Sequence, residues 1–232
     1  MGVQQFLYGV YPYIAGTVFL LGSLIRFDRE QYTWRADSSQ LLSRKDLRLG
    51  SNLFHIGILA LFFGHLFGLL IPHQAFTALG ISDLAHQHLA ICIGSLFGIV
   101  CMIGGVLLWR RRMFNPRVRA TSRFMDIFIL TWLLITLGFG LLTIPFSLYD
   151  AVHGNATEMV LLTRWVQSIA TLQPDPTYLD GVRFIYKIHL FFGLTVFLLF
   201  PFTRLVHVWS APITYLRRPY QIVRTKFVHY YR

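Results

Sequence analysis

Five apolar segments constrain the fold of this chain more than any other feature of its sequence. They cover residues 6–25, 53–71, 89–109, 124–146 and 184–209. A helix of about 20 residues is about 30 Å long, which matches the hydrocarbon core of a bilayer. Because hydrocarbon offers no partner to backbone polar groups, each segment must cross as a helix. The sequence predicts an all-α integral membrane protein, a bundle of five transmembrane helices.

The composition points to the same class. Of the 232 residues, 55% are hydrophobic and 13% are charged, and the charges fall in blocks between the apolar segments. A net charge of +11 would suggest nucleic acid in a soluble protein, but here the basic residues flank the spans, so we expect no nucleic-acid partner. No Lys or Arg precedes the first apolar segment, so no cleaved signal peptide is expected. The spacing of Cys92 and Cys101 does not fit a redox or zinc motif.

The basic residues also predict the orientation of the bundle. Seventeen Lys and Arg residues lie in segments 26–50, 110–123 and 210–232, and three lie on the opposite side of the spans. Since basic residues favour the cytoplasmic side, we expect the N-terminus outside and the C-terminus in the cytoplasm. Residues 1–209 then form a five-helix membrane domain, and residues 210–232 form a cytoplasmic C-terminal tail.

Three segments outside the spans have more than one interpretation. Segment 26–50 is either a solvated loop or a docking surface for a cytoplasmic partner. The tail is basic and aromatic, which fits contact with anionic membrane lipid or with another protein. Residues 155–172 have the pattern of an amphipathic helix on the outer surface, and Asn155 with Glu158 resembles a capping box.

Four histidines lie inside two of the spans. His55 and His65 are in segment 53–71, and His189 and His207 are in segment 184–209. A histidine in hydrocarbon is costly and indicates a functional site when a partner exists. The two spans run in opposite directions, which pairs His65 with His189 near the outer face and His55 with His207 near the inner face. Two pairs of imidazoles predict two six-coordinate haems suited to electron transfer.

The depths of these histidines agree only in part. On a continuous helix, His189 and His207 are five turns apart and share one face, whereas His55 and His65 are about 80° apart. Ten residues rise about 15 Å and eighteen rise about 27 Å. A bend at Pro201 is one way to reduce this mismatch.

Glycines near the histidines have two interpretations. Gly57, Gly64, Gly68 and Gly193 fit close approach of a flat cofactor or ordinary packing between helices. Arg204 likewise fits snorkelling to the interface or pairing with a haem propionate.

A haem-free, histidine-bearing transporter is the competing interpretation from another functional class. Such a site normally adds Asp or Glu at membrane depth. Asp126, at the start of the fourth span, is the only acidic residue within the predicted limits. This scarcity of acidic residues favours haem over transport.

Long motifs along the chain resemble a known family. They are YPYIAGTVFLLGSLIRFDREQYTWRADSSQLL from Tyr11, SNLFHIGILALFFGHLFGLLIPH from Ser51, GGVLLWRRRMFNPRVRATSR from Gly104, GLLTIPFS from Gly140 and LFPFTRLVHVWSAPITYLRRPYQIVR from Leu199. With them the chain resembles, nearly end to end, the gamma subunit of bacterial respiratory nitrate reductase, a membrane cytochrome b.

The resemblance implies a fold, cofactors and partners. It implies a five-helix protein of the bacterial cytoplasmic (inner) membrane with two b haems, ligated by His65 and His189 on the outer side and by His55 and His207 on the inner side. It also implies a cytoplasmic iron–sulfur subunit and a molybdenum catalytic subunit, so nitrate is reduced on another chain.

The resemblance further implies a quinol site beside the outer haem, around Gly64, His65 and Gly68. Family members can use a lysine near the start of the third helix. Here the nearest match is His86, with His88 two residues later. Histidine can exchange a proton with a quinol oxygen at physiological pH.

The sequence therefore predicts a quinol-oxidising dihaem anchor that passes electrons through two haems to the iron–sulfur subunit. No residue of this chain is assigned a further catalytic role. Besides the transporter, the alternative is a dihaem b anchor of another quinone-linked reductase or dehydrogenase.

Overall fold

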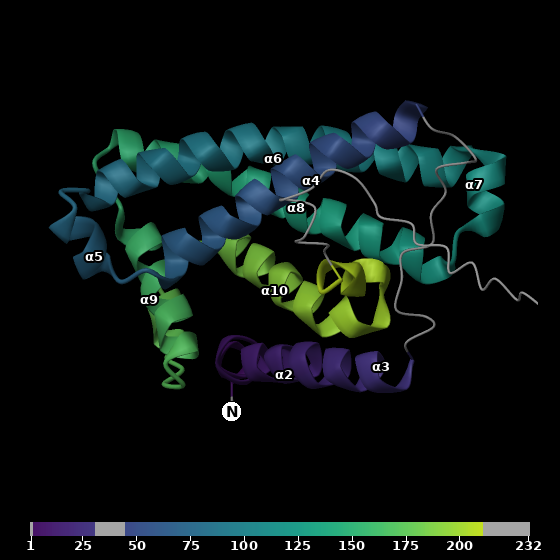
Figure 1. Ribbon diagram of the computed structural model, residues 1–232. Coiled ribbons are helices and arrows are strands. Elements are labelled where there is room, and N and C mark those ends of the chain that lie inside the picture. The colour runs from purple at the N-terminus through teal and green to yellow at the C-terminus, as the bar shows by residue number, and fades with distance from the viewer. Residues whose placement is uncertain (1, 31–44, 211–232) are drawn as a thin grey trace, which may run out of the picture.

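The computed structural model describes residues 2–30 and 45–210, and this part of the chain contains helices and connections but no strand. The N-terminal rod comprises α1 (Val3–Gln5), the π-helical turn η1 (Phe6–Val10), α2 (Tyr11–Thr17), the π-helical turn η2 (Val18–Gly22) and α3 (Ser23–Arg29). The other long helices are α4 (Lys45–Leu70), α6 (Asp83–Phe114), α8 (Phe124–Val152) and α10 (Phe184–Leu199). They lie side by side in one bundle (Figure 1).

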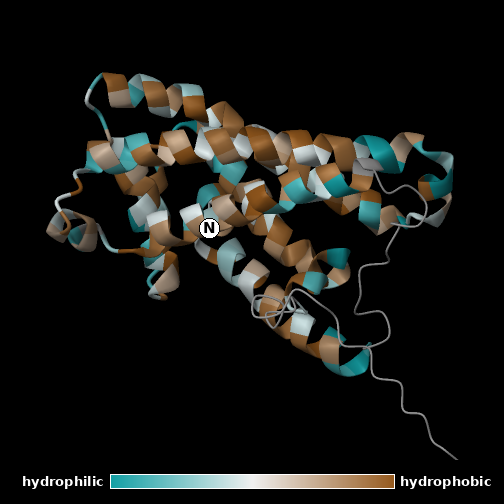
Figure 2. Cartoon of the chain, turned by 45° about the horizontal axis from the view of Figure 1, so that its top comes forward, coloured by the Kyte–Doolittle hydropathy of each residue, from teal (hydrophilic) through white to brown (hydrophobic). Residues whose placement is uncertain are grey.

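The five predicted spans are confirmed as helices that are long and apolar enough to cross a membrane. The spans of the structure are Val3–Arg29, Leu47–Leu70, Asp83–Phe114, Phe124–Val152 and Phe184–Phe202. Hydrophobic residues predominate along the long helices (Figure 2). Many large apolar side chains, such as Ile56 and Phe62 of α4, are exposed on the bundle surface. Since lipid tails solvate such side chains, this surface is that of a membrane protein.

Short elements cover the two ends of the bundle (Figure 1). One end carries α5 (His73–Ala78), α9 (Thr157–Ala170) and the 3-10 turn η4 (Pro176–Leu179). The other end carries α7 (Pro116–Thr121), which joins α6 to α8. The Asn115 side chain begins α7 by accepting hydrogen bonds from the backbone N–H groups of Arg117 and Val118.

Helix α9 is the amphipathic helix that the sequence predicts, but its apolar face packs on protein. Trp165 is buried against Tyr8, Leu179 and Val182, and its indole Nε1 donates a 2.9 Å hydrogen bond to the Tyr8 carbonyl. The helix thereby anchors the N-terminal rod to the end of the bundle.

The predicted capping box at the start of α9 is wrong. The Asn155 side chain accepts from the backbone N–H of Thr157 at 2.9 Å, which satisfies a donor of the first turn. Glu158 turns away from its own helix, and its carboxylate accepts from the backbone N–H of Arg183 at 2.8 Å. The backbone N–H of Arg183, just before α10, therefore binds the carboxylate that a capping box would use.

Helices α4 and α6 approach each other closely through glycines. A Cβ atom added at Gly57 would lie 2.6 Å from the Cβ of Cys101, and one added at Gly104 would overlap the backbone nitrogen of Phe54. Neither position has room for a side chain. Gly57 therefore serves helix packing, which is the plainer of the two interpretations that the sequence allowed.

The fifth span is not one continuous helix to residue 209. The α-helix α10 ends at Leu199, and two 3-10 turns follow, η5 (Phe200–Phe202) and η6 (Arg204–Val208). Pro201 lacks an N–H and cannot continue the helical hydrogen bonds. Arg26 of the N-terminal rod donates to the carbonyls of Pro201 and Thr203, at 2.6 and 2.9 Å. This break separates His207 from the helix that carries His189.

Candidate functional site: two opposed histidine pairs

The structure brings the four intramembrane histidines together as two pairs. The imidazole centroids of His65 on α4 and His189 on α10 are 6.1 Å apart, with ring planes at 44°. The centroids of His55 on α4 and His207 on η6 are 6.2 Å apart, with ring planes at 69°. These are the partners that opposite helix directions predict.

The spacing of each pair fits a metal ion between the rings. Bonds between an imidazole nitrogen and a first-row metal are about 2 Å long, which places the centroids of two opposed ligands roughly 6 Å apart. Stacked rings lie closer, as Phe76 and His86 do with centroids 4.2 Å apart, whereas edge-on rings such as Tyr8 and Trp165 have a similar separation of 6.2 Å. Each pair could therefore hold one metal ion between its two imidazoles, which is the number of side-chain ligands that a six-coordinate haem iron takes.

Hydrogen bonds orient all four imidazoles for ligation through Nε2. In each ring Nδ1 lies within hydrogen-bond distance of a backbone carbonyl. The acceptors are Ser51 for His55 at 2.7 Å, Leu61 for His65 at 2.7 Å, Thr136 for His189 at 3.0 Å and Arg204 for His207 at 2.5 Å. Since a carbonyl only accepts, Nδ1 carries the proton and Nε2 keeps its lone pair. This is the usual arrangement around metal-bound histidine.

Two glycines leave space beside the His65–His189 pair. A Cβ atom added at Gly64 or at Gly193 would meet no neighbouring atom within 4 Å. Gly64 precedes His65, and Gly193 lies one turn after His189 on the same face of α10. These two positions fit a large flat group, in contrast to the crowded Gly57.

His86 lies beside Gly68, about one helical turn of α4 from His65. It is in the first turns of α6 and stacks on Phe76 of α5, and its Nε2 would be 3.5 Å from a Cβ atom at Gly68. Gly68 follows His65 by three residues on α4, so the two share a helix face. His88 instead bonds locally, with Nδ1 2.7 Å from the Leu84 carbonyl. Of the two candidates for the family lysine, His86 is the one beside Gly68.

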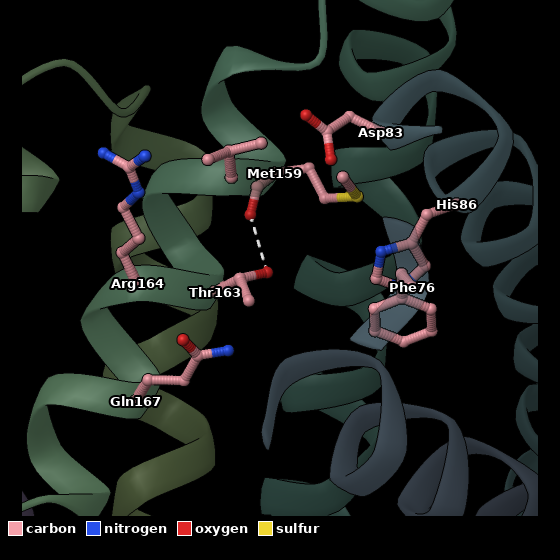
Figure 3. A pocket seen from close by; sticks show the side chains of 8 residues that line it. Phe76, Asp83, His86, Met159, Thr163, Arg164 and Gln167 are labelled. Carbon is pink, nitrogen blue, oxygen red and sulfur yellow. Dashed lines mark hydrogen bonds between the residues drawn. The ribbon is translucent and has the colours of Figure 1, made fainter. Parts of the chain in front are cut away.

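A pocket between α5, α6 and α9 adjoins His86 (Figure 3). Its lining residues are Phe76, Asp83, His86, Met159, Val160, Thr163, Arg164 and Gln167. Aromatic, acidic and amide groups thus meet at the end of the bundle nearest the His65–His189 pair. Sequence reasoning did not find the contribution of α9, because only the tertiary fold brings α9 to α5 and α6.

An ion cluster of Arg183, Asp150 and Glu158 fixes the start of α10. The Arg183 guanidinium donates to both oxygens of Asp150, at 2.6 and 2.7 Å, and to Glu158 at 3.0 Å. Hydrogen bonds to Asp150 raise the pKa of Arg183 above its ordinary value. Burial raises the pKa of Glu158, although contact with Arg183 opposes this shift. Arg183 lies six residues before His189. The cluster was not predicted from the sequence.

A second ion cluster lies at the other end, near His207. Asp126 at the start of α8 is 3.4 Å from Arg112 and 3.8 Å from Arg204. The sequence suggested snorkelling or a propionate partner for Arg204, and the structure adds a carboxylate of the chain itself. Arg204 begins η6, and its carbonyl accepts a hydrogen bond from His207. The ion pair of Arg204 with Asp126 therefore links the segment that carries His207 to α8.

The proposed docking segments fall largely outside the described residues. These segments include residues 31–44 of the loop after the N-terminal rod and residues 211–232 of the tail. Their expected contacts with a partner or with lipid remain predictions.

Comparison with known proteins places these features in a family. The family model described as nitrate reductase gamma subunit matches residues 4–226. The chain is 53% identical over 225 residues to the respiratory nitrate reductase 1 gamma chain of Escherichia coli (strain K12), covering 97% of this chain and 98% of that protein. It is 52% identical over 226 residues to the respiratory nitrate reductase 2 gamma chain of the same strain, with the same two coverages. It is 38% identical over 222 residues to the nitrate reductase gamma chain of Bacillus subtilis (strain 168), covering 96% and 98%.

Proposed function

Since this chain belongs to the nitrate reductase gamma subunit family, we propose that it is the quinol-oxidising dihaem cytochrome b anchor of a respiratory nitrate reductase. The observation that carries the proposal is the presence of two opposed imidazole pairs. Their ring centroids are 6.1 Å apart in one pair and 6.2 Å apart in the other. Two imidazoles that face each other within membrane-spanning segments have little use in packing, because each leaves a polar nitrogen to satisfy.

The four histidines have assigned roles in this proposal. His65 and His189 hold the outer haem b, and His55 and His207 hold the inner haem b. Each haem would supply one-electron transfer when bound. The carbonyl partners of Nδ1 hold each imidazole in one orientation and in the tautomer that leaves the Nε2 lone pair for ligation.

Quinol binds beside the outer haem in the proposal, against Gly64, His65, Gly68 and His86. Oxidation of one quinol releases two electrons and two protons. His86 accepts a proton from a quinol hydroxyl through Nε2, and stacking on Phe76 holds its ring in place. The adjoining pocket faces the end of the bundle that carries α5 and α9, which we assign to the outer side. Protons leave there, and the charge separation contributes to the membrane potential.

We further propose the surroundings of the chain. It lies in the bacterial cytoplasmic membrane with the N-terminus outside, in accord with its basic segments. A cytoplasmic iron–sulfur subunit docks on segment 26–50 and on the tail at 210–232, and a molybdenum catalytic subunit beyond it reduces nitrate. Residues 1–209 then act as the membrane domain.

The haem content of purified protein tests the proposal. We expect about two haem b per chain by pyridine haemochrome assay, because each of the two pairs offers two imidazole ligands to one haem. A helical circular dichroism spectrum serves as the control for folding. Folded protein without haem would refute the assignment and favour the transporter. One haem per chain would show that only one of the two histidine pairs binds haem.

The role of His86 gives a separate prediction. Replacing His86 by alanine should lower the rate of quinol oxidation by about 100-fold or more, the usual contribution of one proton-transfer group. Haem content should remain at the wild-type value, since His86 ligates no iron. Quinol-dependent reduction of the haems, followed by stopped-flow absorbance, measures the rate. His88→Ala is the matched control on the same helix, and an equal loss in both variants would contradict a specific role for His86.

A further inference from the structure

We propose that α8 positions the outer haem ligand His189, through the backbone carbonyl of Thr136 and the missing side chain of Gly140. This inference rests on the proposed ligation of the outer haem by His65 and His189. It adds Gly140 as a positioning residue, with no contact to iron required.

His189 differs from the other three histidines in where its hydrogen bond leads. His55, His65 and His207 each bond through Nδ1 to a carbonyl three or four residues earlier on their own segment. His189 alone reaches another helix, where the Thr136 carbonyl lies 3.0 Å from its Nδ1. The orientation of this ring therefore depends on how α8 and α10 sit together.

The reach of His189 to that carbonyl requires glycine at position 140. Thr136 and Gly140 are one helical turn apart, so the Thr136 carbonyl already accepts from the Gly140 N–H within α8. A carbonyl oxygen has a second lone pair, and His189 takes it. A Cβ atom at position 140 would lie 2.8 Å from Cε1, 3.3 Å from Nδ1 and 3.4 Å from Nε2 of His189. Even a methyl group would therefore clash with the ring in its present position.

Contacts on both sides of this point prevent the two helices from moving apart. One turn before Thr136, the Trp132 indole donates a 3.1 Å hydrogen bond to the Phe192 carbonyl of α10. Beyond Gly140, the Tyr186 hydroxyl donates to the Thr143 carbonyl at 3.4 Å. With α8 held to α10 at two points, an added methyl group displaces the His189 ring rather than the helix.

The displaced ring would lose its proton acceptor and the direction of its Nε2. Partners of the second ring nitrogen fix the tautomer and raise the basicity of a ligating histidine, and their loss typically weakens metal affinity by about 10–100-fold. The expected effect is confined to the outer site, because the inner pair has its own carbonyl partners.

Gly140→Ala tests this inference against Gly138→Ala on the same helix. Position 138 has room, since the nearest atom to its added Cβ is the Met102 methyl carbon at 4.0 Å. Both variants and the wild type are purified in detergent, and the measurements are haem b per chain and the low-spin electron paramagnetic resonance signals. We expect two haems and unchanged signals in Gly138→Ala. In Gly140→Ala we expect loss or displacement of one low-spin signal, with the other unchanged.

The outcomes separate this inference from the proposed function. Wild-type protein without haem would refute the proposed function itself. Two haems and wild-type signals in folded Gly140→Ala would overturn the positioning role alone. If Gly140→Ala does not fold, the double variant Gly140→Ala/His189→Ala decides. Recovery of a folded, one-haem protein would support a clash with the ring, and continued unfolding would overturn it.

Discussion

Replacing His65 by alanine should abolish quinol oxidation coupled to nitrate reduction and lower the haem content from about two per chain to about one. His65 is the proposed haem ligand on α4, and its ring centroid lies 6.1 Å from that of His189. Alanine would leave only the His189 imidazole to hold the proposed outer haem, and it would remove a wall of the proposed quinol site. His189→Ala should have the same effect from the opposite helix.

The two losses are measured separately. Pyridine haemochrome assays of the purified complex give the haem content, and quinol-dependent nitrate reduction gives the activity. Reduced methyl viologen, which donates electrons without a quinol site, serves as the control for the partner subunits. His153→Ala is a matched control, because His153 is exposed at the end of α8 and bonds to the Tyr149 carbonyl of its own helix. Full quinol-dependent activity in His65→Ala or His189→Ala would refute the assignment of the outer site.

The sequence predicts the helices of this fold well because membrane helices depend on local composition. Each apolar segment satisfies its own backbone groups, so its existence can be read without tertiary information. Opposite directions of successive spans also suffice to pair His65 with His189 and His55 with His207. Both kinds of inference need only the order of segments along the chain.

The end of the fifth span shows where local information fails. Pro201 marks a bend in the sequence, but the extent of the break depends on Arg26, which lies 175 residues earlier and bonds to the Pro201 carbonyl. The expected match of His189 and His207 on one helical face assumed a continuous helix. In the structure His207 reaches His55 from a separate 3-10 turn. The spacing of His189 and His207 along the chain therefore need not match the spacing of His55 and His65.

The tertiary contacts of individual residues could not be predicted from the sequence either. Glycine at position 140 looks like any other small residue of a membrane helix, and only the packing of α8 on α10 reveals His189 against it. Glu158 fits a capping motif by sequence, yet it bonds to Arg183. Such contacts join residues far apart in the chain, and no periodic pattern encodes them.

Replacing Arg183 by methionine should destabilise the protein by about 3 kcal/mol, because removal of this partly exposed cation leaves two largely buried carboxylates, Asp150 and Glu158, uncompensated. Asp150 is 5% exposed and receives both of its hydrogen bonds from the Arg183 side chain, and Glu158 receives a third. Methionine keeps much of the side-chain volume, so loss of charge and hydrogen bonding dominates the effect. In a chain of this size, 3 kcal/mol corresponds to a fall in melting temperature of roughly 6–12 °C.

Thermal unfolding in detergent, followed by circular dichroism, measures the change. Arg164→Met on α9 is the matched control, since Arg164 is exposed and a surface substitution of this kind changes stability by about 0.5 kcal/mol or less. The double variant Arg183→Met/Asp150→Asn should recover part of the loss, because it removes the buried charge that Arg183 compensates. Equal melting temperatures for Arg183→Met and Arg164→Met would show that the cluster does not stabilise the start of α10. A fall without any recovery in the double variant would assign the loss to side-chain packing rather than to charge.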